Sequence, residues 1–171
     1  MNEIREIVTK AIIGKGKKII RINDVVTPMN EPFSILGCWI INHEFEANLV
    51  NNLVELVGNF EVNIWYSYDN NTKTDVARNI VNYTEVVKTR QIVKEVNNDS
   101  RDVIVRILQQ PTCTNAKINN NTMELDIIFE VMAEIIGETK MMVTVFTSID
   151  SVDAIEEDFE NEIDENFMNT K

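Results

Sequence analysis

The residues of this sequence that could carry out chemistry are few and widely spaced. His43 is the only histidine, and it lies in an apolar run without a serine or cysteine placed as in a nucleophilic triad. No nucleotide-binding loop, nucleophile elbow or HExxH motif occurs, and Gly14 and Gly16 form a lone GxG that indicates only a turn. We therefore expect a structural role for His43 and predict a protein that is not an enzyme and has no cofactor.

The two cysteines are also poor candidates for a metal site. Cys38 and Cys113 lie 75 positions apart, with no CxxC spacing and no neighbouring histidines, which excludes zinc. Cys38 falls among expected core residues, whereas Cys113 follows a proline in an expected exposed turn. Both are interpreted first as small buried hydrophobes. If either forms an intermolecular disulfide, we expect it to be Cys113.

Aromatic residues gather at Trp65, Tyr66 and Tyr68. They could line a ligand groove, for instance for a carbohydrate, but core and cross-strand packing is the more common role of such residues. Trp65 differs from the other two because it shares a strand face with polar residues. We predict that Trp65 is covered by another layer or lies in an interface between subunits.

The acidic end of the chain, residues 150–171, carries nine carboxylates and one lysine. Its apolar residues are spaced as one stripe of a helix: Val152, Ile155, Phe159, Ile163 and Phe167. Like charges at i, i+4 oppose that helix in isolation, so we expect a tail that becomes helical against a partner. A simple solvated tail and a weak Ca²⁺ site remain alternatives, although the spacing does not fit a calcium-binding loop.

Composition limits the class of protein further. The chain has 171 residues, 44% of them hydrophobic, which favours one domain with a proper core plus the tail. The formal net charge of −12 makes nucleic acid an unfavourable partner and basic proteins favourable ones. No apolar run is long enough to span a membrane and the start does not resemble a signal peptide, so we expect a cytoplasmic protein.

The clearest structural element is a long β-hairpin over residues 57–87. Phe60, Val62, Ile64, Tyr66 and Tyr68 recur at every second position, which predicts one buried strand face. Asp69-Asn70-Asn71 follows as the turn.

The other segments predict further short strands. Residues 3–13 fit either a helix or a strand, with strand favoured, and GKGKK at 14–18 is expected to interrupt it. Core strands are predicted at 34–45, 103–108 and 124–136, with a return strand at 141–146. Connections are predicted at 46–52, at 97–100, and at 137–140 as a hairpin turn, and Pro111 is expected to end a strand or mark an edge.

Together these segments predict a mainly β protein, an antiparallel sandwich or barrel of seven to eight strands. Residues 1–149 would form the body and residues 150–171 the flexible acidic tail.

Several sequence blocks, taken in order, resemble the outer spore coat morphogenetic protein family, CotE. These are REIVTKA (5–11), SILGCWIINH (34–43), VNIWYSYDNNTKT (62–74), ILQQPTC (107–113) and EIIGETK (134–140). The similarity covers nearly the whole chain, and five ordered blocks are far more specific than one short motif. The tail departs from the family because it is shorter and lacks tryptophan.

The resemblance implies a structural protein. Family members assemble around the forespore in the mother cell, are placed there by the basement-layer machinery of the coat, and recruit outer coat proteins. It implies that the body self-associates and localises, while the tail, through Phe159, Ile163 and Phe167, binds clients. It also implies that Cys113 matches a family position and is the cross-linking candidate once the coat meets oxygen.

Overall fold

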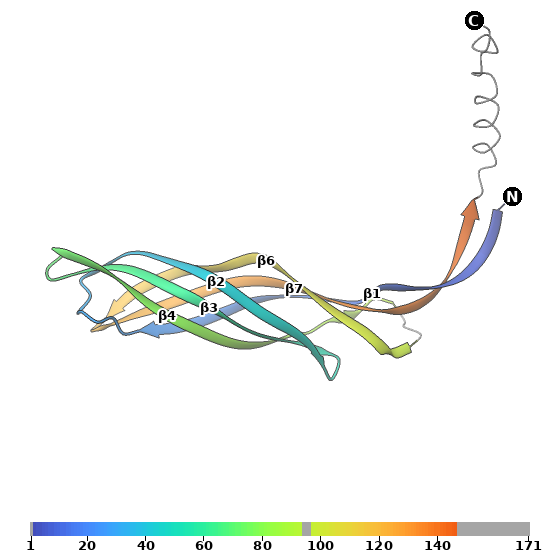
Figure 1. Cartoon of the computed structure of the whole chain (residues 1–171), viewed down its shortest axis with the longest axis horizontal. Coiled ribbons are helices and arrows are strands. Elements are labelled where there is room, and N and C mark those ends of the chain that lie inside the picture. Colours follow the sequence, from blue (N-terminus) through green and yellow to red (C-terminus); the bar gives the residue numbers. More distant parts are fainter. Residues whose placement is uncertain (1, 94–96, 147–171) are drawn as a thin grey trace, which may run out of the picture. The chain divides into compact units, whose positions relative to one another are not determined.

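The computed structural model describes residues 2–93 and 97–146, and within them the chain forms seven strands and no helix. The strands are β1 (Asn2–Val26), β2 (Ser34–Val50), β3 (Leu53–Tyr68), β4 (Lys73–Val87), β5 (Arg90–Gln91), β6 (Asn97–Asn119) and β7 (Thr122–Phe146). They form a four-stranded sheet in the order β5-β1-β7-β6 and a three-stranded sheet in the order β2-β3-β4, both antiparallel (Figure 1). The predicted sandwich is confirmed.

Contacts divide the chain into two compact units. The larger unit is residues 9–139 and contains the sandwich core. The smaller one combines the start of β1 with the end of β7, and within it Lys140 Nζ lies 3.0 Å from a carboxylate oxygen of Glu6.

The predicted central hairpin is confirmed as β3 and β4. Its strands pair from Val54↔Val87 to Tyr68↔Lys73 without a register shift. The turn between them places Asp69, Asn70 and Asn71 at positive φ, which short polar side chains tolerate better than branched ones. Thr72 Oγ1 closes the turn by donating to the Asp69 carbonyl oxygen at 2.6 Å.

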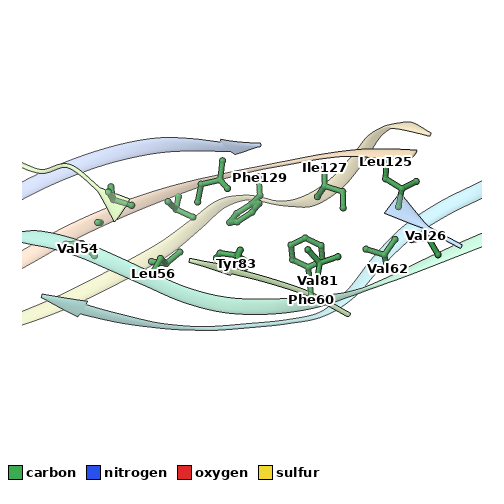
Figure 2. Packing of buried hydrophobic residues seen from close by; sticks show 14 of the residues in the cluster. Val26, Val54, Leu56, Phe60, Val62, Val81, Tyr83, Leu125, Ile127 and Phe129 are labelled. Carbon is green, nitrogen blue, oxygen red and sulfur yellow. The ribbon is translucent and has the colours of Figure 1, made fainter. Parts of the chain in front are cut away.

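The core lies between the two sheets. Figure 2 shows side chains of β3 and β4 pointing toward those of β7, with Phe129 between the layers. The predicted buried face is confirmed for Phe60, Val62, Ile64 and Tyr66, which are fully buried, whereas Tyr68 is half-buried against the core. On β7 the inward positions are Met123, Leu125, Ile127, Phe129, Val131, Ala133 and Ile135. Burial of such side chains at every second position stabilises a sandwich by about 1.5–3 kcal/mol for each large residue.

Strand β2 differs from the predicted buried strand at 34–45. It pairs only with β3 in its sheet, so it is an edge strand, and all of its residues are half-buried or exposed. A register shift between Ile41 and Glu44 contains Asn42, which has a φ of 54°. This bulge changes which residues face inward. Before it, Cys38 and Ile40 face the core, and after it every second residue from position 43 onward does.

Several predicted breaks in the strands are wrong. Strand β1 runs through the lysine-rich segment 14–18, and β2 continues to Val50 through most of the predicted connection at 46–52. Strand β6 begins at Asn97, inside the turn predicted at 97–100, and β7 passes through the hairpin turn predicted at 137–140. The real turns are short and rich in asparagine. Asn51, Asn52 and Asn120 adopt positive φ, as required by tight two-residue hairpin connections.

Pro111 lies inside β6 rather than at its end. The prediction that it marks an edge is confirmed, because β6 is an edge strand and its pairing with β7 shifts between Gln109 and Thr112. A bulge in an edge strand is one of the few places in a sheet that accept proline.

Side chains join the two sheets along their edges. Strand β1 reaches β4 through Lys18, whose Nζ lies 2.6 Å from a Glu85 carboxylate oxygen, and through Asp24, which accepts from the Asn79 amide at 2.8 Å. On the other side β2 and β6 are in contact. The sandwich is therefore held at both seams.

Candidate interaction surface

The outer face of the three-stranded sheet presents both tryptophans of the chain. The strand registers place three rows of residues across this face: Gly37↔Trp65↔Val76, Trp39↔Asn63↔Arg78, and Ile41↔Glu61↔Ile80. We call these nine residues the tryptophan face. Residues directly opposite one another in antiparallel strands lie on the same side of the sheet, so the three rows form one continuous surface.

Apolar side chains on this face are unusually open to solvent. Trp39 and Trp65 are each 44% exposed, and Ile80 is 64% exposed. Contiguous exposed apolar residues rimmed by polar ones are typical of protein-binding surfaces, and tryptophan is the residue most enriched where binding energy concentrates. The sequence pattern indicated Trp65 but missed Trp39. That Trp39 lies opposite Asn63 on the same face becomes visible only from the strand register, which the bulges of β2 determine.

At the centre of the face lies an amide with unused hydrogen-bonding capacity. Asn63 is 3% exposed, and its Nδ2 has no hydrogen-bond partner among the described residues. Leaving a buried donor unpaired costs about 1–3 kcal/mol. The predicted polar side of β3 is thus not simply solvated, since Asn63 and Ser67 are both buried there.

Trp65 and Tyr66 do not line one groove, the less favoured alternative from the sequence, because the two side chains lie on opposite faces of β3. Tyr66 is fully buried in the core, whereas Trp65 is on the outer face. Tyr66 and Tyr68 stack toward one another with ring centroids 6.1 Å apart, which is the packing role expected for them.

His43 lies in an aromatic cluster between the sheets. Its Nε2 is 2.6 Å from the Tyr83 hydroxyl, and its ring centroid is 5.3 Å from that of Phe129. Gly58 lies opposite Tyr83 in the sheet, and a Cβ there would come within 2.6 Å of both the Tyr83 hydroxyl and the Glu44 carbonyl oxygen. The surroundings of His43 are packed rings and a phenol, which fit a structural role.

Burial gives this cluster a pH dependence that can be measured. Burial lowers the pKa of His43 below its ordinary value of 6.5 and raises that of Tyr83 to about 12. As the pH is lowered, His43 is therefore protonated at a higher pH in the unfolded chain than in the folded chain. The stability that the neutral histidine contributes is complete above pH 6.5 and is lost as the pH falls from there toward the folded pKa.

We expect His43→Gln to flatten the pH profile of stability between pH 7 and pH 5. Denaturant unfolding of the wild type and the variant is measured at a series of pH values. The contributions of the carboxylates, which both proteins share, cancel in the difference between the two unfolding free energies. His43 is the only histidine, so no other group of ordinary pKa near 6.5 contributes. A difference that does not vary with pH would contradict the assignment.

The two cysteines are far apart in the sequence but line the same hollow between β2 and β6. Both are half-buried free thiols. Cys113 is part of β6 and packs against the core, so the predicted exposed turn is wrong. The intermolecular disulfide expected of Cys113 stays a prediction.

The remaining predicted site residues, Val152, Ile155, Phe159, Ile163 and Phe167, lie outside the described residues. Within residues 2–93 and 97–146, no three metal-ligating side chains come together. The same part of the chain has no helix that is long and apolar enough to cross a membrane.

The fold and its exposed face define a class: an antiparallel β-sandwich with a broad aromatic surface on one sheet. A family model described as outer spore coat protein E (CotE) matches residues 3–171. The chain therefore belongs to the CotE family of outer spore coat proteins, as the five sequence blocks predicted. No curated protein and no solved structure matches the chain.

Proposed function

We propose that this outer spore coat protein multimerises around the forespore in the mother cell and recruits other coat proteins to the layer that it forms. The tryptophan face is the observation that carries this proposal. Its two exposed tryptophans and the exposed Ile80 are the kinds of group that gain most from contact with a second protein surface.

A second copy of the chain is the occupant that this face fits best. Glu61 and Arg78 lie on it, one row apart on adjacent strands. A surface with both an acid and a base can pair with itself about a two-fold axis, each acid meeting the base of the other copy. The apolar residues around them would then be buried by the same residues of the other copy.

The acidic tail is proposed as the client-binding element, with Val152, Ile155, Phe159, Ile163 and Phe167 as its apolar contacts. Burial of four of these five side chains would contribute roughly 6–12 kcal/mol before the cost of ordering the tail is subtracted. Several kcal/mol of ordering leaves a weak interaction for one tail. Many tails in one multimer would strengthen it through avidity.

Removing residues 150–171 is expected to leave self-association intact while reducing capture of coat proteins by tenfold or more. Light scattering after size-exclusion chromatography measures the first quantity, and pull-down from a sporulating-cell extract measures the second. A tail with Phe159, Ile163 and Phe167 changed to serine keeps the charge and serves as the matched control for electrostatic capture. A full-length protein that is monomeric at micromolar concentration would argue against the whole proposal.

Carbohydrate binding is the alternative function, and one observation favours it: two tryptophan rings exposed on the same face could pack against a sugar ring. Glycan-array binding that Trp65→Ala abolishes, with self-association unchanged, would support this alternative instead.

A further inference from the structure

The two cysteines occupy facing edges of the two sheets. Cys38 lies on β2 of the three-stranded sheet and Cys113 on β6 of the four-stranded sheet, and these two strands are in contact. Both side chains line one hollow, which is formed by residues 35–38 and 113–116. Both also pack against the core from the same seam.

The backbone at both positions departs from regular pairing. A register shift between Ile35 and Gly37 directly precedes Cys38, and another follows Cys113 before Asn115. Bulges re-aim neighbouring side chains. Here the irregular stretches lie at the positions where the two thiols meet.

We propose that Cys38 and Cys113 form a disulfide within one chain, which joins the two sheets across the β2–β6 seam. Both thiols line the same hollow, and the strands that carry them are in contact, so the two sulfur atoms can approach one another across the seam. The bond closes a loop that contains β3, β4 and β5.

The two thiols have different roles in the exchange. The hydrogen bond with Cys113, together with burial, raises the pKa of Cys38, and the hydrogen bond from Cys38 lowers the pKa of Cys113. Cys113 is therefore the thiol that more readily loses its proton, and the thiolate is the reactive form.

The oxidant is a small disulfide, and the electrons balance in two exchanges. The Cys113 thiolate attacks one sulfur of the small disulfide, forms a mixed disulfide and releases one small thiolate. Cys38 then loses its proton to water and attacks Cys113 Sγ, which releases the second small thiolate. Two protein thiols become one disulfide while the small disulfide is reduced to two thiols.

Reduced full-length protein treated with oxidised glutathione is the test. We expect chains that are not covalently linked to one another and are each lighter by two hydrogen atoms, a linked peptide pair containing Cys38 and Cys113, and a melting temperature about 10 °C higher than that of the reduced form. Dithiothreitol should reverse all three changes.

Single-cysteine variants separate this bond from one between chains. In Cys38→Ser, we expect glutathione attached to Cys113, with no gain in melting temperature. Covalent dimers of the wild type linked through Cys113 on both chains, without the internal peptide pair, would overturn the proposal. So would a wild type that retains both free thiols under the same treatment.

Discussion

Replacing Trp39 and Trp65 together by alanine is expected to weaken self-association about a thousandfold. Each side chain is 44% exposed on the tryptophan face, so each is free to bury its ring in a neighbouring copy. Truncating a tryptophan at the centre of an interface costs about 2 kcal/mol or more, and two such losses amount to roughly 10³ in the dissociation constant. Sedimentation velocity over a concentration series measures the shift.

The control for this pair is Ile104→Ala on the four-stranded sheet, where the side chain is 40% exposed. It also removes exposed apolar surface but lies away from the tryptophan face. Neither variant removes core contacts, so melting temperatures at low concentration should stay near that of the wild type. A double tryptophan variant that assembles like the wild type would exclude this face as the contact between copies.

Phe129→Ala is expected to lower the free energy of unfolding by about 3–5 kcal/mol. The side chain is fully buried between the sheets, and its ring centroid lies 5.1 Å from that of Tyr83 and 6.3 Å from that of Phe60 (Figure 2). Alanine would lose the transfer free energy of the ring and leave a cavity that the paired strands cannot close. Urea unfolding followed by fluorescence measures the loss.

Phe33→Ala is the matched control, because it deletes the same ring from a side chain that is 57% exposed. We expect its effect to stay below about 1 kcal/mol. If Phe129→Ala proves too unstable to purify, Phe129→Leu keeps most of the volume and should show a smaller loss in the same direction. Equal losses for Phe129→Ala and Phe33→Ala would show that the aromatic cluster does not hold the sheets together.

The central hairpin could be predicted because its signal is local. From Phe60 to Tyr66 the apolar residues alternate, and the Asp69-Asn70-Asn71 turn is one that these residue types favour. A strand with one buried face and a regular register needs no information from distant parts of the chain. The sandwich class followed from several such segments.

Strands β1 and β2 could not be delimited because their alternation changes phase. In β1, Ile13 and Gly14 are adjacent and both buried, so inward positions switch parity there. In β2 the bulge at Asn42 does the same. Outward isoleucines and valines in β1, such as Ile4 and Val8, add a stripe that also fits a helix. Bulges are set by tertiary pairing and leave little trace in sequence.

The site was only partly predictable for the same reason. Trp65 stood out because its own strand alternates cleanly. The pairing of Trp39 with Asn63, and the meeting of Cys38 with Cys113, depend on registers and on a seam between sheets that no spacing in the sequence encodes.

The irregular edge of β6 has a consequence for how copies of this protein can join. Pro111 lacks a backbone donor, and the pairing of β6 with β7 shifts register repeatedly between Ile107 and Asn115. Such an edge is a poor template for adding a foreign strand by hydrogen bonding, which is the route to amyloid. In the proposed multimer, growth through side-chain faces would instead be reversible on dilution, so a misplaced copy could dissociate and bind again in register.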